Sequence, residues 1–453
     1  MQKRVLADIR GVNFAYVATQ TFLVLCISQV LYLVVSIITA RMLGPSGKGI
    51  TTIFILYPTL LFTIGHLSVY RAITVHVAED KYRFSDFPGS VLAFALAASA
   101  VLMAGFVTVF FSHRQYFIQN ASFALILAAL TITPFSMITQ TFSSILQAKG
   151  RIDEFNIVQL AQAGSMVICI AVALLVLKSG VTGTVWAYVA ANLLTCLTAV
   201  YFVSRIAPRP WNINTLLIRR LVIDGMKLHL GVIASFIFLK IDMLMLSYYR
   251  RPESVGYYAI AVAMADLIML APTALQHVFF SKFSSMINDK MDMAKKTILV
   301  YKHAILLSLV FACLLALFAR PIVLLIYGAD FFPSIKLFLI LLPGVWFFWQ
   351  NNILVYYMVG NKRFLLISLM ATFGSLINVV LNCMFIPRQG AIGAAVASLI
   401  TYFILGVVYF FFFLWASGYS FKNFGRELMV RKEDAIFYSA LLKSVFKGST
   451  GSV

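Results

Sequence analysis

Long apolar stretches recur throughout this 453-residue chain, and they constrain its fold more than any other feature. A membrane-crossing α-helix needs ~20 mostly apolar residues. Only 11% of the residues are charged, whereas an average soluble protein has about 25%. Because helices and closed barrels alone satisfy every backbone hydrogen bond in a bilayer, we predict an all-α membrane protein. Twelve spans are expected, at 17–40, 50–77, 88–111, 118–146, 155–177, 182–203, 221–249, 255–280, 299–319, 332–358, 364–386 and 391–416.

The positive charges predict the orientation of these spans. With the N-terminus in the cytoplasm, 24 of the 36 Lys and Arg fall on the cytoplasmic side, eight on the opposite side and four within spans. Cytoplasmic loops of membrane proteins are enriched in these residues, so both termini are expected to be cytoplasmic. The net charge of +20 would suggest nucleic-acid binding in a soluble chain. Here the topology accounts for it, and no nucleic-acid partner is predicted.

The sequence offers no support for an enzyme or a bound cofactor. All five cysteines fall inside apolar runs and form no CxxC pair, which argues against a zinc site. P-loop, HExxH and nucleophile-elbow motifs are missing from the sequence. We therefore predict no catalytic residues, no metal and no cofactor.

Two halves of the chain are related by an offset of about 210 residues. "SGVTGTVWA" (179–187) resembles "QGAIGAAVA" (389–397), and Gly49 has a counterpart in Gly256. With six spans in each half, both halves enter the membrane in the same direction. This predicts two six-helix lobes in a parallel repeat, as in two-lobed transporters. The expected boundaries are 1–210 and 211–416, followed by a basic cytoplasmic tail at 417–453.

Five stretches together carry a family resemblance. They are "ARMLGPSGKG" (40–49), "LQAKGRIDEFN" (146–156), "FLKIDMLMLSYYRRPESVGYYAIAVA" (238–263), "LLPGVWFFWQNNILVYYMVGNKR" (341–363) and "NVVLNCMFIPRQGAIGAAVASLITY" (378–402). The set resembles the Wzx-type oligosaccharide-lipid flippases, within the multidrug/oligosaccharidyl-lipid/polysaccharide exporter superfamily. The resemblance implies a V-shaped, MATE-like bundle of two lobes.

The same resemblance implies a function. Such a protein would move undecaprenyl-pyrophosphate-linked oligosaccharide across the bacterial cytoplasmic membrane by alternating access, for O-antigen, capsule or exopolysaccharide synthesis. It implies membrane lipids and a polysaccharide polymerase complex as partners. Lipid II flippases, which usually have Arg then Asp after the first helix, fit less well, because no acid follows Arg41 here. Drug exporters often keep a carboxylate in the N-terminal lobe, whereas the first six spans contain no Asp or Glu in their interiors.

Polar side chains in the second span are candidate substrate ligands. His66 and Tyr70 belong to a stripe of polar residues between positions 59 and 74, spaced so that one helix face carries them all. Arg71 lies beside the stripe, and a guanidinium suits a pyrophosphate because it donates parallel charged hydrogen bonds. Alternatively, these hydroxyl groups bond neighbouring helices and Arg71 reaches lipid headgroups.

The seventh span carries further candidates. Lys227 and Lys240 could face the anionic lipid head, and Asp242 could couple transport to a proton or sodium ion together with Asp266 of span 8. Lys240 and Asp242 cannot share a helix face, so each needs its own partner. The alternative is that both pair with neighbouring helices and hold the lobe together.

The stretch "ARMLGPSGKG" is expected to form the outer turn between spans 1 and 2. Proline cannot continue a helix without losing a backbone hydrogen bond, so Gly44 and Pro45 should end the first span. Arg41 could then meet the arriving pyrophosphate at an outer gate. A plain turn with solvated cations is the alternative.

Two other functions stay open. A cation-coupled multidrug or small-molecule exporter of the same fold would have an apolar, acidic cavity. A non-transporting scaffold for polysaccharide assembly would have its centre filled by side chains. A cavity lined by cations favours the flippase.

Overall fold

A computed structural model describes residues 14–79, 81–112, 122–207, 209–269, 290–361 and 363–429. Every regular element in these ranges is helical. Ten of the helices there are long and apolar enough to cross a membrane. The chain is therefore a multi-pass, all-α membrane protein, as the apolar stretches predict.

Most of the predicted spans coincide with observed helices. In the first half these are α2 (Phe14–Gly65), α3 (Val69–Glu79), α4 (Asp86–Ser112), α5 (Phe123–Leu130), α6 (Ile132–Ala148), α7 (Ile152–Ala171) with η2 (Val172–Val176), and α8 (Gly180–Ile206). In the second half they are α9 (Thr215–Tyr249), α10 (Pro252–Asp266) with η3 (Leu267–Met269), α12 (Lys290–Leu317), α13 (Ala319–Ile322) with η4 (Val323–Tyr327) and η5 (Ala329–Phe331), α14 (Pro333–Gly360), α15 (Phe364–Gln389), α16 (Ala391–Ser417) and α17 (Phe421–Leu428).

Some predicted boundaries differ from those of the described helices. Helix α2 holds the first predicted span and the beginning of the second, and its 52 residues are interrupted at Gly44 between the two. Helix α10 begins the predicted span 255–280, but positions 270–280 lie outside the described residues. Most of the predicted tail 417–453 lies outside them as well.

The turn in "ARMLGPSGKG" occurs where the sequence predicts it. Gly44 has φ 65° and ψ −176°, a conformation that glycine adopts without steric cost. The chain then packs against its counterpart in the second half. A Cβ added to Gly49 would lie 1.8 Å from the carbonyl oxygen of Pro252, and one added to Gly256 would lie 2.1 Å from that of Pro45. The two matching glycines of the repeat therefore meet backbone to backbone.

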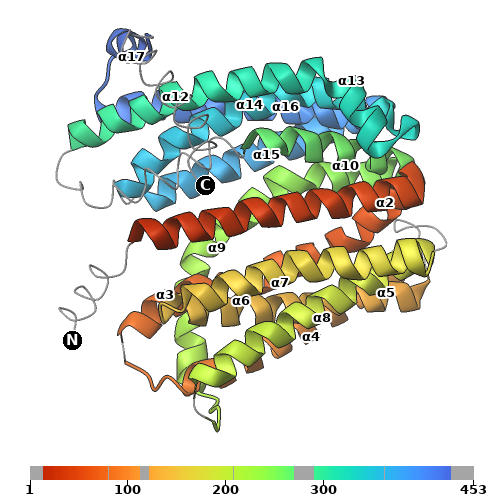
Figure 1. Cartoon of the computed structure of the whole chain (residues 1–453). Coiled ribbons are helices and arrows are strands. Elements are labelled where there is room, and N and C mark those ends of the chain that lie inside the picture. Colours follow the sequence, from red (N-terminus) through yellow and green to blue (C-terminus); the bar gives the residue numbers. More distant parts are fainter. Residues whose placement is uncertain are drawn as a thin grey trace, which may run out of the picture.

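The helices run side by side in two groups (Figure 1). In that view α3–α8 lie below, and α10 and α12–α16 lie above, with the first part of α2 between them. Helix α9 links the groups, since it packs against α3 and α4 at one end and against α15 and α16 further along. The start of α2 and α17 lie at one end of the bundle, and the turn at Gly44 lies at the other.

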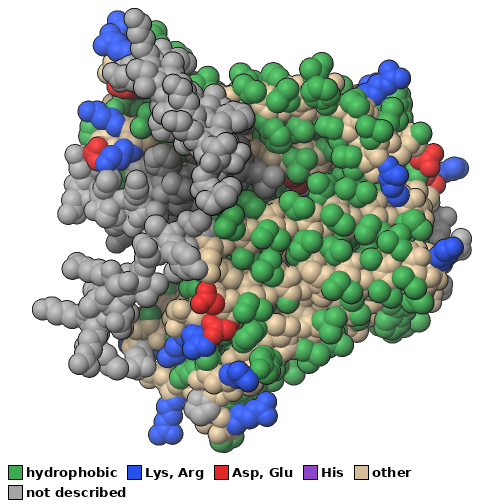
Figure 2. Space-filling view, viewed as in Figure 1, with side chains coloured by type: hydrophobic (Ala, Val, Ile, Leu, Met, Phe, Trp, Pro, Cys, Tyr) green, Lys and Arg blue, Asp and Glu red, His purple; other side chains and the backbone are tan. Residues whose placement is uncertain are grey.

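The outer surface is largely apolar. Figure 2 shows hydrophobic side chains covering the middle of the bundle, with most charged side chains towards its two ends. Leu317, Leu325 and Val101 are more than 70% exposed. An apolar band of this kind, bordered by charge, is the surface that a bilayer solvates.

Candidate functional site: a polar pocket beside α9

The second predicted span is not one continuous helix. Helix α2 ends at Gly65 and α3 begins at Val69. Between them Leu67 and Ser68 have φ of 43° and 53°, in the left-handed region that non-glycine residues rarely adopt. His66 stabilises this break, because its Nδ1 accepts a hydrogen bond of 2.9 Å from the Ser68 amide. The expectation of an unbroken stripe of polar residues across 59–74 is wrong for this reason.

Helix α9 packs directly on the break. Gly225 makes this approach possible, since a Cβ there would lie 2.3 Å from the carbonyl oxygen of Leu67. One turn further on, His229 Nε2 lies 3.0 Å from the Ile64 carbonyl and donates to it. His229 Nδ1 lies 3.4 Å from the Ser68 hydroxyl. His229 thus satisfies the Ile64 carbonyl, a backbone group next to the break.

A pocket of about 320 Å³ lies between this broken helix, α6 and α9. His66, Tyr70 and Lys240 all line it, so the structure brings together three of the predicted substrate ligands. Gln140 of α6 and Ser235 of α9 add further polar groups, while Phe62, Val232, Phe236 and Leu239 supply apolar walls. The pocket thus combines one cation with neutral hydrogen-bonding groups.

The ring of His66 is fixed in the pocket wall by aromatic contacts. Its centroid lies 5.0 Å from that of Phe62, 5.2 Å from Tyr70 and 5.3 Å from His229, all edge to face. Since Nδ1 accepts a hydrogen bond from the Ser68 amide, the ring proton is on Nε2. His66 is 4% exposed. It can therefore offer a directed N–H donor at a rigid position.

Lys240 is the cation of the pocket. It is half-buried, and no carboxylate lies within 4 Å of its ammonium in the described part of the chain. Asp242 and Asp266 are within electrostatic range of it, but neither lines the pocket. The ammonium is thus available to an anion.

Asp242 faces the interior of the second half, away from the pocket. Its side chain is 1% exposed and accepts hydrogen bonds from Tyr258 of α10 (2.5 Å), Ser398 of α16 (3.3 Å) and the Met243 amide (2.7 Å). Asp266 is half-buried, and both carboxylates are within electrostatic range of Tyr402 on α16. The contacts of Asp242 agree with the alternative in which it joins neighbouring helices.

More oxygen atoms gather close to Asp242. Ser398 and Thr401 are one turn apart on α16, and Thr401 accepts a hydrogen bond from Asn378 (3.5 Å). Asn378 in turn accepts one from Asn382 (2.8 Å). The Asn382 carbonyl oxygen is buried without a hydrogen-bond partner. Carboxylate, amide and hydroxyl oxygens are the ligands that hard cations take, so these residues could hold a small cation.

Two other predicted ligands lie outside the pocket, near the end of the bundle where α2 starts. Arg71 is exposed, and its Nε donates to the Tyr70 hydroxyl (2.9 Å). Lys227 forms an ion pair with Asp224 (2.6 Å), which also bonds His76 of α3 (2.8 Å). These charges join α9 to α3 at this end.

Arg41 is not brought to the pocket. Its guanidinium donates to the carbonyl oxygens of Leu325 and Ile326 in η4, at the opposite end of the bundle. Lys48, from the same turn, donates to Thr39 (2.8 Å). Both cations therefore have partners within the protein, where they stabilise the turn.

Gln140 is the pocket residue that sequence reasoning missed as a ligand. In the sequence it has a counterpart in Gln350, 210 residues later, which indicates the repeat and not a site. By its spacing of seven residues, Ser235 shares a helix face with Asp242 and not with Lys240. Helix periodicity predicts which residues share a face of a helix. It does not identify the helix or cavity that each face contacts.

Comparisons with known proteins identify the family and the fold of the chain. A family model described as "Polysaccharide biosynthesis protein" matches residues 18–275. A search of curated proteins found no match. Among solved structures, the chain resembles the lipid II flippase MurJ in an inward-closed conformation, with TM-score 0.72, 17% identity, and coverage of 96% of this chain and 93% of that one.

Two further structures resemble the chain. One is an inward-facing multidrug resistance MATE family transporter of the MOP superfamily, with TM-score 0.66, 13% identity, and coverage of 86% and 94%. The other is a MOP superfamily transporter from Pyrococcus furiosus described as having a binding pocket of reverse polarity, with TM-score 0.59, 13% identity, and coverage of 89% and 94%. At these identities the likeness shows the fold, which is the MATE-like fold that the sequence predicts.

Proposed function

Since this chain belongs to the polysaccharide biosynthesis protein family, we propose that it is a flippase for lipid-linked oligosaccharides. Its substrate would be an undecaprenyl-pyrophosphate-linked repeat unit, moved from the cytoplasmic to the outer leaflet of the bacterial cytoplasmic membrane. The product would supply O-antigen, capsule or exopolysaccharide synthesis. Both termini would be cytoplasmic, and residues 1–210 and 211–416 would form the two moving lobes.

The observation that carries this proposal is the chemistry of the pocket beside α9. Lys240 supplies a positive charge that no carboxylate neutralises within hydrogen-bonding distance in the described residues. A buried or half-buried cation near neutral donors favours a phosphate group. Gln140, Tyr70 and His66 can bond sugar hydroxyls, and the aromatic walls can pack on a sugar face.

Substrate entry would use the exposed cations on the cytoplasmic side. Arg71 lies next to Tyr70 at the edge of the pocket, and Lys227 lies four turns from Lys240 on α9. A volume of about 320 Å³ is at the small end for a ligand pocket. An oligosaccharide therefore requires α9 to move away from the broken helix, so the described conformation is a closed one.

Asp242 and Asp266 would couple this movement to a proton or sodium ion. Asp242 joins three helices through Tyr258 and Ser398, so a change in its charge or in a bound cation alters the packing of α9 against α10 and α16. Lys240 lies two residues from Asp242 on α9. An ion that binds at Asp242 can thus move Lys240, the cation that holds the substrate.

The multidrug exporter is the competing function. A pocket for cationic drugs needs a carboxylate or an uncharged aromatic lining, and the ammonium of Lys240 would repel such a cargo. The scaffold alternative would leave no space beside α9. The cation-bearing pocket favours the flippase over both.

The test is transfer of a fluorescent undecaprenyl-pyrophosphate oligosaccharide across liposomes that contain the purified protein, with and without a pH or sodium gradient. Lys240→Gln should reduce the initial rate at least tenfold, because a charged hydrogen bond to phosphate contributes about 1.5–3 kcal/mol. Lys240→Arg should keep most of the rate. Asp242→Asn should remove the gradient dependence.

Arg320→Gln serves as the matched control, since it removes an exposed cation of α13 that lines none of the described pockets. It should transport at the wild-type rate. Wild-type protein that exports cationic dyes and moves no lipid-linked glycan would refute the flippase. Equal rates for Lys240→Gln and the control would refute the role of the pocket.

A further inference from the structure

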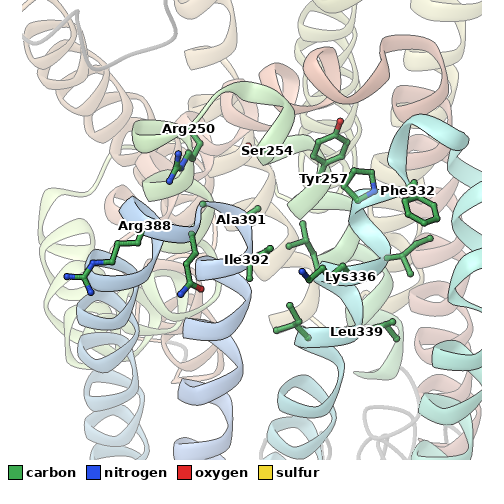
Figure 3. A pocket seen from close by; sticks show the side chains of 15 residues that line it. Arg250, Ser254, Tyr257, Phe332, Lys336, Leu339, Arg388, Ala391 and Ile392 are labelled. Carbon is green, nitrogen blue, oxygen red and sulfur yellow. The ribbon is translucent and has the colours of Figure 1, made fainter.

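A second cavity, of about 830 Å³, lies at the end of the bundle away from α17. It is a groove between the beginning of α14 and the turn from α15 to α16, and the turn from α9 to α10 covers it (Figure 3). Under the proposed topology this end faces the outer leaflet. The groove shares no residue with the pocket beside α9.

Three cations line this outer groove, namely Arg250, Lys336 and Arg388. No Asp or Glu lines it. Lys336 and Arg388 have no hydrogen bond or ion pair with any other described residue. Figure 3 shows Lys336 on α14 extending towards Ala391 and Ile392 across the groove. The groove is therefore a concentration of positive charge with unused donors.

Arg250 is held in place by the backbone of the α15–α16 turn. Its Nη2 donates to the carbonyl oxygens of Pro387 (2.8 Å) and Ile386 (3.4 Å). Gly390, with φ +60°, allows this contact, because a Cβ there would lie 3.1 Å from the Arg250 Nε. A guanidinium positioned in advance loses little entropy when it binds an anion.

Two helix N-termini add to the positive potential. Helices α14 and α16 both begin at the groove and are 28 and 27 residues long. The first amides of a helix have no partner within the helix, and its dipole favours an anion at this end. Arg250, Lys336 and the two helix ends thus border the same groove, while Arg388 extends away from Lys336 at its rim (Figure 3).

The groove also has an apolar side that lipid can reach. Phe332, directly before α14, is 54% exposed, and Leu339, in the second turn of α14, is 43% exposed. A ligand with a phosphate end and a hydrocarbon chain satisfies both surfaces. Three cations without an acid match the charge of a diphosphate better than the single negative charge of a phospholipid phosphodiester. The volume of the groove is in the range of ligand pockets.

We infer that this outer groove binds the pyrophosphate end of the lipid-linked substrate after it reaches the outer leaflet. The groove is a release site distinct from the pocket beside α9. This inference rests on the proposed function for the identity of the lipid. Arg250 and Lys336 hold the diphosphate, Arg388 adds positive charge at the rim of the groove, and the chain of the lipid lies along Phe332 and Leu339.

The test measures binding and does not need transport. Native mass spectrometry of the full chain in detergent gives the apparent Kd for undecaprenyl pyrophosphate, with dioctanoyl phosphatidylglycerol as a second probe. All variants carry Lys240→Gln, which removes the cation of the pocket beside α9. Adding Lys336→Gln and Arg388→Gln should raise the Kd for undecaprenyl pyrophosphate at least tenfold.

Two further variants keep the result interpretable. Arg320→Gln, a cation at the same end but outside the groove, should leave the Kd unchanged. Lys336→Arg with Arg388→Lys keeps the charge and should restore binding. Unchanged binding in the neutral variant, or no restoration by the charge-keeping one, would overturn the inference. Equal losses for both lipids would overturn it too, since the groove would then be a phospholipid site. Failure of transport by the wild type would refute the flippase without altering these binding results.

Discussion

Replacing Tyr258 with phenylalanine tests how the second half of the bundle is held together. The change removes one hydroxyl from a side chain that is fully buried, and it leaves the ring in place. That hydroxyl donates to Asp242 at 2.5 Å and lies 3.2 Å from Ser398. The substitution therefore removes a donor and creates almost no cavity.

The expected cost follows from the partners that remain. After the change, the partners of Asp242 among the described residues are the Met243 amide at 2.7 Å and the Ser398 hydroxyl at 3.3 Å. A hydrogen bond to a charged group contributes about 1.5–3 kcal/mol. Interhelical hydrogen bonds in membranes average about 0.6 and reach about 1.7 kcal/mol. The two ranges overlap at about 1.5–1.7 kcal/mol, so we expect Tyr258→Phe to lower the free energy of unfolding by about that amount.

The assay is reversible unfolding of the purified protein by sodium dodecyl sulfate in mixed micelles, followed by intrinsic fluorescence. Tyr409→Phe is the matched control, because Tyr409 lies on α16, is 4% exposed and has no hydrogen bond with a described residue. It should change stability by less than about 0.5 kcal/mol. Equal stability of the two variants would refute the argument that the hydroxyl supports Asp242.

Three further changes test the turns and the close approaches. Gly49→Ala should prevent recovery of folded protein from size-exclusion chromatography, because its Cβ would lie 1.8 Å from the Pro252 carbonyl oxygen, whereas Gly105→Ala meets open space on α4 and should be recovered normally. Gly225→Ala should separate α9 from the break after α2, which would appear as a lower thermal unfolding midpoint and slower transport; wild-type values for both would contradict this packing. Arg41→Gln removes donors to two carbonyls of η4 and should cost about 1 kcal/mol of stability without changing the affinity for substrate. A large loss of affinity in that variant would instead favour a role at an outer gate.

Much of the architecture could be predicted from sequence because the bilayer imposes it. Inside the hydrocarbon each span must satisfy its own backbone hydrogen bonds, and a long apolar stretch does so by forming a helix. The turn at Gly44 was equally local, since glycine permits a positive φ and Pro45 cannot donate a backbone hydrogen bond. The repeat also predicted that Gly49 and Gly256 occupy equivalent positions in the two halves. In the structure these two positions contact each other.

The break at His66 was not predictable in this way. No proline lies between Gly65 and Val69, and the local sequence is compatible with a continuous helix. The break is stabilised by His229, whose donor to Ile64 comes from 165 residues away. Signals within one span carry no information about such a partner, because it is brought there by the crossing of another helix.

The family and the MATE-like fold were within reach of the sequence, and the comparisons support both. Helix geometry also required Lys240 and Asp242 to point in different directions. The sequence alone, however, left open which side chain faced a cavity and which faced other helices. Packing decided this: α10 and α16 enclose Asp242 with two hydroxyls, while the break in α2 leaves a polar space in front of Lys240. Burial and long-range contact are properties of the assembled helices, and they give two neighbouring charges on one helix their different roles.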